Sequence, residues 1–208
     1  MRPLHRINSV LKRFTPVLAL TAVCWVVFLV NNLMLGGQLS QYGIIPRRLS
    51  GLPGILCSPF LHASFRHLVA NTLPLLILGG IICARGKGEF ATVTTGGILL
   101  GGFLTWLFAR SAYHIGASGL IFTFFAFLAS LAWFNRNIPT LLLSLVCIVG
   151  YGGLVRGLIP TSTAVSWESH LAGFLSGVFL AWATSKVAKE PKPAKAPGVP
   201  SFKEPVNR

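Results

Sequence analysis

The chain carries one serine and one histidine whose surroundings suit nucleophilic catalysis within a membrane. Ser118 lies in the phrase Gly116-Ala117-Ser118-Gly119, which begins a long apolar stretch, and His170 begins another. The chain contains no Asp and only four Glu, so a triad of Ser, His and Asp cannot form. A serine nucleophile with a histidine base can still hydrolyse a peptide bond if polar or backbone groups stabilise the oxyanion.

The scarcity of acids excludes other routes to peptide hydrolysis. An aspartic protease needs two Asp carboxylates that share a proton, and a zinc protease of the His-Glu-x-x-His type needs that string, which is absent. The four cysteines form no Cys-x-x-Cys pair and are interpreted as small buried apolar residues rather than metal ligands or disulfides. We therefore expect no metal and no cofactor.

The composition is that of an integral membrane protein. Hydrophobic residues make up 53% of the 208 residues and charged residues only 11%, whereas soluble domains carry about 25% charged residues. The net charge of +14 comes from cations at the two ends and in short loops, without a basic stripe interleaved with aromatic residues. This distribution favours contact with anionic lipids over binding of nucleic acid.

The pattern of apolar segments predicts an all-α, polytopic bundle of six transmembrane helices. A basic cytoplasmic leader is expected at 1–14, the membrane domain at 15–187, and a disordered, basic, proline-rich cytoplasmic tail at 188–208. The connection 36–64 is too apolar for a solvated loop, so it is interpreted as a partly embedded first loop. The six helices are predicted at 15–35, 65–83, 90–108, 118–134, 139–158 and 167–186.

The distribution of Lys and Arg sets the expected orientation. With both termini in the cytoplasm, 13 of the 18 Lys and Arg residues lie inside and five outside, as the positive-inside rule requires. The second, fourth and sixth helices then run from outside to inside. His67, Ser118 and His170 lie near their outer ends, so the three side chains share one depth. The fourth helix is short, about 25 Å against a bilayer core of about 30 Å, which places Ser118 inside the membrane boundary.

Two further polar groups lie beside the expected nucleophile. His67 and Asn71 are four residues apart, on one face of the second helix. Both can donate hydrogen bonds to a developing oxyanion, together with backbone N–H groups at the start of the fourth helix. Gly116 and Gly119 remove side chains where backbone must approach closely.

These residues together resemble the rhomboid family of intramembrane serine proteases, in its six-helix bacterial form. The resemblance covers the helical body from about residue 16 to 186, and the motifs occur in the family's order. They are Phe60-Leu61-His62-Ala63-Ser64-Phe65, His67-Leu68-Val69-Ala70-Asn71, Gly116-Ala117-Ser118-Gly119 and His170-Leu171-Ala172-Gly173-Phe174-Leu175-Ser176-Gly177.

The resemblance implies a role for each matching position. Ser118 would be the nucleophile and His170 its general base. The backbone at Ser118, with His67 and Asn71, would form the oxyanion hole beside Gly116. Gly173 and Gly177 would let the sixth helix pack closely against the fourth at Gly119. Phe122 stands where the family often has Tyr, and its ring would pack against the base.

The resemblance also implies a location and a substrate class. The protein would reside in the bacterial inner membrane, with both termini in the cytoplasm. It would cleave transmembrane proteins near the outer face. The substrate helix should unwind readily at its outer end, through Gly, Pro or polar residues, and carry a small residue before the cut. Substrate would enter laterally, below the connection 158–167.

Alternatives remain beside this interpretation. His114 is a rival base, and Glu168 is the only acid near His170, although residues two apart on a helix point in different directions. His62 is expected to anchor the first loop. A catalytically silent binder of transmembrane helices would share the fold but would not need both Ser118 and His170. A small transporter or channel would require polar residues along several helices or an inverted repeat, which we do not find.

Overall fold

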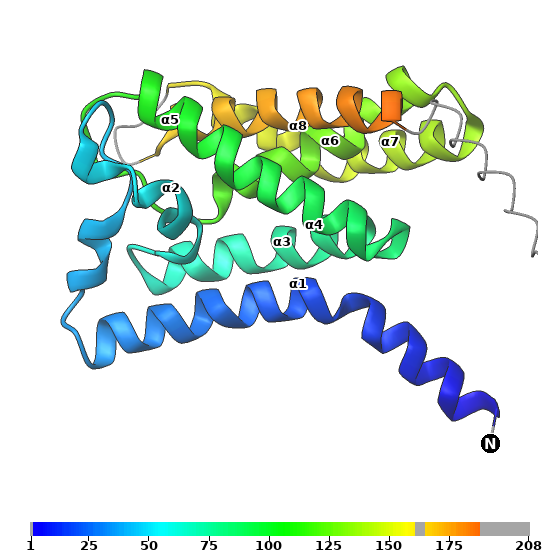
Figure 1. The fold of residues 1–208 in the computed structure, drawn as a ribbon, viewed down its shortest axis with the longest axis horizontal. Coiled ribbons are helices and arrows are strands. Elements are labelled where there is room, and N and C mark those ends of the chain that lie inside the picture. The colour runs from blue at the N-terminus through cyan, green and yellow to red at the C-terminus, as the bar shows by residue number, and fades with distance from the viewer. Residues whose placement is uncertain (1, 161–164, 188–208) are drawn as a thin grey trace, which may run out of the picture.

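A computed structural model of the chain describes residues 2–160 and 165–187 (Figure 1). The predicted tail at 188–208 lies outside the described residues. The described part of the chain is helical, contains no β-strand, and forms the bundle expected from the sequence. The helical spans are α1 (Arg2–Leu33), α3 (Phe65–Arg85), α4 (Lys87–Gly96) with a π-helical turn (Gly97–Gly101) and α5 (Gly102–Phe108), α6 (Ser118–Asn135), α7 (Ile138–Tyr151) with a 3₁₀ extension (Gly152–Leu158), and α8 (Trp167–Val187).

Five of these spans are long and apolar enough to cross a membrane, and the protein is an integral multi-pass membrane protein. They are Lys12–Leu33, Phe65–Arg85, Lys87–Phe108, Ser118–Asn135 and Ile138–Leu158. The sixth predicted helix is present as α8, with 21 residues, but it is less apolar because its first turns carry Glu168 and His170. Its polar side chains are tolerated because α8 packs most extensively against α6, in the interior of the bundle.

The first helix is longer than predicted. We expected it to begin near residue 15, whereas α1 begins at Arg2 and continues without interruption through Pro16 to Leu33. Pro16 does not end the helix, and Figure 1 shows α1 bent in its N-terminal half.

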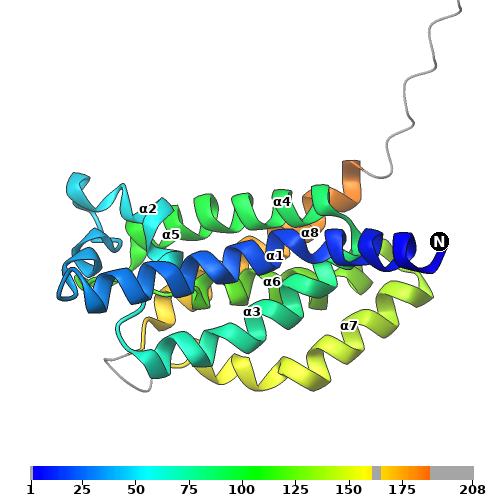
Figure 2. The ribbon, with the colours of Figure 1, turned by 90° about the horizontal axis from the view of Figure 1, so that it is seen from below.

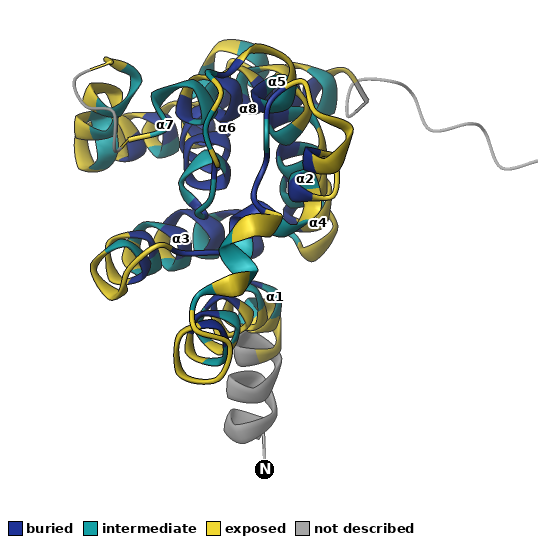
Figure 3. Cartoon of the chain, turned by 90° about the vertical axis from the view of Figure 1, so that its left-hand side faces the viewer, coloured by how far each residue is buried: buried dark blue, intermediate teal, exposed yellow. Residues whose placement is uncertain are grey.

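α6 forms the centre of the bundle because its sequence is apolar on every face. Residues 120–128 are all buried, and Phe124 and Phe127 are fully enclosed. α8, α7 and α3 pack around α6, and α1 packs against the outer side of α3. Viewed from the end in Figure 3, the buried residues gather around α6, whereas α1, α3 and α7 turn exposed faces outwards. Exposed apolar side chains on these faces are suited to contact with lipid tails.

The first connection is folded against the loop that precedes α6. It contains four short helical turns, Gln38–Tyr42, Leu49–Gly51, α2 (Gly54–Cys57) and Ser58–Phe60. Ile44 and His114 exchange two backbone hydrogen bonds of 3.0 Å, and the Arg47 side chain donates to the carbonyl of Ala109 at 2.7 Å. Figure 2 shows this connection at the end of the bundle opposite the N-terminus. These contacts fix the position of the loop from 109 to 117, which leads directly to Ser118.

Candidate active site

The serine and the histidine singled out in the sequence form a hydrogen-bonded pair. Ser118 is the first residue of α6, and His170 lies in the first turns of α8. The Oγ of Ser118 is 2.9 Å from Nε2 of His170. The other ring nitrogen, Nδ1, is 2.9 Å from the carbonyl oxygen of Gly157. A carbonyl can only accept, so Nδ1 carries the proton and Nε2 offers its lone pair to the serine hydroxyl.

The plane of the His170 ring is held by an aromatic neighbour. Phe122, one turn after Ser118 on α6, stacks on His170 with ring centroids 4.4 Å apart and an interplanar angle of 9°. The imidazole is buried, with 9% exposure. It is therefore fixed by a ring on one face and by hydrogen bonds at both nitrogens. This is the contact expected of Phe122 in place of a tyrosine.

Two glycines of α8 allow the two helices to approach until their backbones touch. A Cβ on Gly173 would overlap the carbonyl oxygen of Gly119, and one on Gly177 would overlap that of Thr123. The hydroxyl of Thr123 lies 3.1 Å from the carbonyl oxygens of both Gly119 and Gly173, which ties the helices together. The separation of α6 and α8 therefore depends on the missing side chains, and it brings Nε2 of His170 within reach of Ser118.

Gly116 has a left-handed backbone conformation, and its missing side chain leaves room for the ring of His67. Its φ is +118°, and a Cβ there would lie 2.6 Å from Cε1 of His67. His67 is positioned because Ser64 caps α3, accepting a 3.2 Å hydrogen bond from the His67 backbone N–H. One turn later, the Asn71 amide donates to the His67 carbonyl at 3.0 Å and keeps a second N–H available.

These side chains line one open pocket of about 560 Å³. Ser118 and His170 lie in it together with His67 and Asn71. No side chain caps the start of α6, and the first N–H groups of a helix have no acceptor within the helix, so donors are available beside Ser118. The remaining lining residues are Ala63, Ser64, Ala70, Pro74, Ile121, Phe122, Gly153, Leu154, Gly157, Val165 and Ser166.

The other titratable groups considered from the sequence lie around this pair. His62 is buried, and its Nε2 accepts a long hydrogen bond of 3.5 Å from the backbone N–H of Ala117. Burial, with a smaller contribution from His67, lowers the pKa of His62 to about 4, so the ring is neutral. The rival base His114 bonds to Arg110 and Ser166, and Glu168 pairs with Arg110; neither has a hydrogen bond to Ser118 among the described contacts.

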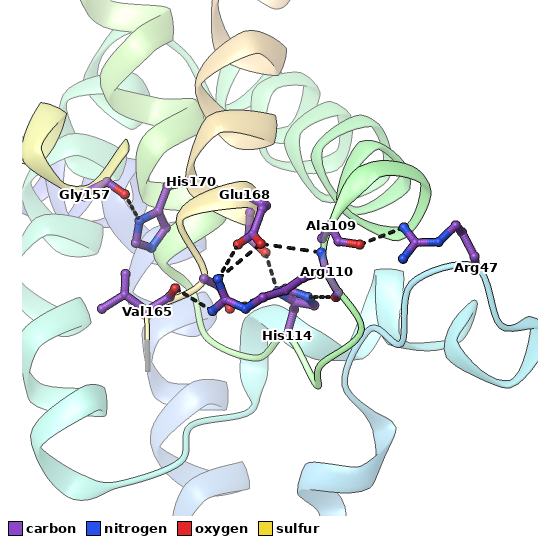
Figure 4. A network of polar contacts seen from close by, with 10 residues as sticks. Arg47, Ala109, Arg110, His114, Gly157, Val165, Glu168 and His170 are labelled. Carbon is purple, nitrogen blue, oxygen red and sulfur yellow. Dashed lines mark hydrogen bonds and ion pairs between the residues drawn. The ribbon is translucent and has the colours of Figure 1, made fainter. Parts of the chain in front are cut away.

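Two parts of the site were not predicted from the sequence. The first is the carbonyl of Gly157, which holds the base; a backbone acceptor has no residue type that would mark it. A Cβ at Gly157 would lie 2.9 Å from the Phe122 ring and 3.1 Å from Nδ1 of His170. The glycine itself was therefore the feature of the sequence that could have indicated a close contact at this position. The second is the ion pair between Arg110 and Glu168, drawn in Figure 4, which joins residues far apart in the sequence.

Comparison with known proteins finds a matching family and several relatives. Residues 50–187, from the first connection to the end of α8, match the Rhomboid domain family. The chain belongs to the rhomboid family. An uncharacterized protein of Mycobacterium tuberculosis is 36% identical over 196 residues, covering 90% of this chain and 81% of the relative. Another, from Mycobacterium leprae, is 36% identical over 194 residues, covering 89% and 76%.

A plant relative shares a shorter region. The RHOMBOID-like protein 4 of Arabidopsis thaliana is 31% identical over 135 residues, which cover 61% of this chain and 32% of the plant protein. This rhomboid-family chain therefore has similar proteins in bacteria and in a plant.

Proposed function

We propose that this rhomboid-family protein is an intramembrane serine endopeptidase that cleaves transmembrane proteins near the outer membrane face. The observation that carries the proposal is the 2.9 Å contact between Ser118 Oγ and His170 Nε2, with Nδ1 held by the carbonyl of Gly157. A base oriented in one tautomer against a serine hydroxyl, beside an open pocket with free donors, is the arrangement that acyl transfer requires.

The first half of the reaction forms an ester on the serine. Oγ of Ser118 attacks the carbonyl carbon of the scissile peptide bond, and its proton passes to Nε2 of His170. The tetrahedral intermediate then collapses. The bond to the leaving nitrogen breaks, the proton on Nε2 passes to that nitrogen, and the C-terminal fragment leaves as an amine. The carbonyl of Gly157 stabilises the transient imidazolium in the role that an aspartate has in a triad.

The second half releases the acyl group. A water molecule gives a proton to Nε2 of His170 and attacks the ester carbonyl. Collapse of this second intermediate returns the proton to Oγ of Ser118 and frees the N-terminal fragment as a carboxylic acid. Both intermediates carry a negative oxygen, to which three groups donate hydrogen bonds: the backbone N–H at Ser118, the imidazole of His67 and the amide of Asn71.

The proposed orientation is supported by the distribution of Lys and Arg, and the proposed substrate by the depth of Ser118. With both termini in the cytoplasm, Ser118 lies toward the outer face and inside the membrane boundary. A peptide bond in a stable helix has its backbone groups hydrogen-bonded and shielded, so the substrate must unwind near its outer end. We propose transmembrane substrates with helix-breaking residues there and a small residue before the cut, reaching the pocket laterally.

The test uses purified protein and a matched pair of single-span substrates of defined orientation. One carries Gly, Pro and Ala near its outer end, and the other has a continuous poly-Leu span. We expect cleavage of the first at an outer-end site, read by mass spectrometry of the fragments, and labelling of Ser118 by a fluorophosphonate. The poly-Leu span should remain intact because its backbone is not exposed.

Three results would contradict the proposal. Equal cleavage of the poly-Leu substrate would exclude the requirement for unwinding, and cleavage at the cytoplasmic end would exclude the orientation. Absence of both labelling and cleavage would favour the alternative function, a catalytically silent protein that binds transmembrane helices. The hydrogen-bonded Ser118–His170 pair argues against that alternative, since binding alone needs neither the nucleophile nor the base.

Replacing His67 or Asn71 with alanine is expected to slow cleavage without abolishing it. Loss of one oxyanion donor typically costs about 2.7–4 kcal/mol of transition-state stabilisation, and the backbone donors at Ser118 remain to compensate in part. The kcat of each variant should fall more than its KM changes. Unchanged turnover of the double variant His67→Ala/Asn71→Ala would show that the two residues only support the fold.

A further inference from the structure

An ion pair joins the two segments that deliver the nucleophile and the base. Arg110 lies in the loop that leads to Ser118, and Glu168 lies in the first turn of α8, before His170. Nη1 of Arg110 is 3.2 Å from both carboxylate oxygens of Glu168. The Glu168 side chain is only 11% exposed, so water screens this pair less than a surface ion pair.

Arg110 contacts the same segment in two further ways. Its Nη2 donates to the carbonyl of Val165 at 2.9 Å, and its backbone N–H lies 3.4 Å from the carboxylate of Glu168. One residue therefore binds both the start of α8 and the chain just before it. Figure 4 shows Arg110 between Glu168 and Val165, on the side of α8 away from Gly157.

His114 forms a second connection between the same two segments. Its Nε2 is 3.0 Å from the carbonyl of Arg110 and therefore carries the proton, while Nδ1 is 2.9 Å from the hydroxyl of Ser166 and accepts from it. Burial lowers the pKa of His114, and the hydrogen bond to Arg110 and the charge of Glu168 oppose this only in part. The neutral ring is suited to one donated and one accepted bond.

The contacts reach the base through the first turn of α8. The carbonyl of Ser166 accepts the backbone N–H of His170 at 3.2 Å, so the residue that His114 holds also begins the helical turn of the base. We name Arg110, His114, Val165, Ser166 and Glu168 the loop clamp. The hydrogen bonds of the His170 ring go to Ser118 and Gly157, which leaves Glu168 outside the reacting atoms.

We propose that Arg110 and Glu168 are positioning residues, which set the register between the loop before Ser118 and the first turn of α8. The inference rests on the proposed protease function. The chain contains no Asp, and Glu168 is the acid nearest to His170. Glu168 influences the position of His170 by holding the first turn of α8, and it makes no hydrogen bond to the imidazole among the described contacts. The hydrogen bond between Ser118 and His170 spans two helices, so a small shift of either segment lengthens it.

The charge of Glu168 is essential to the clamp. Glutamine at this position would keep the shape, but it would remove the negative charge and replace one of the two acceptor oxygens with an NH2 group, which is a donor like the N–H groups of Arg110. The first turn of α8 would then be held to the loop mainly by the hydrogen bonds of Val165 and Ser166, and it would shift more readily. A displacement of about 1 Å at a distance from the chemistry can lower a rate about 100-fold.

The test compares Glu168→Gln with the wild type in two assays on the full chain. We expect kcat for cleavage and the rate constant of fluorophosphonate labelling at Ser118 each to fall about 100-fold, with KM changed less than about twofold. The final extent of labelling, which counts folded protein, should equal that of the wild type. Glu89→Gln is the matched control: it breaks the 2.9 Å Arg85–Glu89 ion pair between α3 and α4, and both rates should stay at wild-type values.

Variants of Arg110 complete the test. Arg110→Lys should recover part of the rate that Arg110→Gln loses, since it restores the charge but not the fork of donors. The double variant Arg110→Gln/Glu168→Gln should be no slower than the slower single variant if the pair acts as a unit. If Glu168→Gln does not fold, the Arg110 variants still test whether the ion pair positions His170.

The outcomes of these assays distinguish a failure of the loop clamp proposal from a failure of the proposed protease function. A wild type that neither labels nor cleaves would overturn the protease function itself. A labelled wild type with Glu168→Gln reacting at the same rate would overturn the clamp alone. A normal rate with a reduced final extent of labelling would also overturn it, because Glu168 would then support folding and not the alignment of the base.

Discussion

Replacing Ser118 with alanine, or His170 with alanine, is expected to abolish cleavage while the protein still folds. The two side chains are joined by one 2.9 Å hydrogen bond, and among the described contacts no other serine hydroxyl is hydrogen-bonded to the His170 ring. Loss of one member of such a unit lowers kcat on the order of 10⁴–10⁶-fold. The measurement is cleavage of the helix-breaking substrate by each purified variant, with helix content checked by circular dichroism.

The matched control is Ser130→Ala, which removes a serine from the same helix far from the pocket, and it should keep wild-type activity. The double variant Ser118→Ala/His170→Ala should be no slower than either single variant, because a nucleophile without its base and a base without its nucleophile fail at the same step. Substantial cleavage by Ser118→Ala would exclude the serine mechanism. An additive loss in the double variant would show that the two residues act separately.

Much of this fold could be predicted because each transmembrane helix corresponds to one continuous run of apolar residues in the sequence. The predicted and observed bounds of the second, fourth and sixth helices agree within about two residues. The meeting of Ser118 with His170 followed from the parallel direction of those helices and from the glycines of α8. These features are periodic or local, so one sequence is sufficient to recognise them.

Other features depend on tertiary contacts and leave no local signal. The π-helical turn at Gly97–Gly101 lies where the third span packs against α6 and α8, and a run of apolar residues and glycines predicts only a helix there. The pairing of Arg110 with Glu168 joins residues 58 apart in the sequence, and nothing in the local sequence of either residue indicates its partner. The predicted start of α1 at residue 15 was wrong because it followed the change from basic to uncharged sequence. The leader has apolar residues at helical spacing, Leu4, Ile7, Leu11 and Phe14, and it extends the helix to Arg2.

The second large loss of activity is expected from a substitution at Gly173, where α6 and α8 approach each other closely. Gly173→Ala is expected to lower kcat about 100-fold or more and to destabilise the protein by about 1–3 kcal/mol. The added Cβ would overlap the carbonyl oxygen of Gly119, which is backbone and cannot rotate away. The helices must therefore separate or slide, and the separation is transmitted to Ser118 and His170, one turn or less from these two glycines. Turnover and the unfolding midpoint in detergent measure the two effects.

The same substitution at another helical glycine separates this overlap from any general effect of alanine. Gly150 lies in α7 with no atom within 4 Å of a built Cβ, so Gly150→Ala should leave turnover unchanged and stabilise the helix by up to about 1 kcal/mol. If Gly173→Ala matches Gly150→Ala in both measurements, the helices can part without disturbing the dyad. In that case the stacking of Phe122 and the carbonyl of Gly157 would suffice to hold His170, and the distance between Ser118 and His170 would not depend on the glycine contacts.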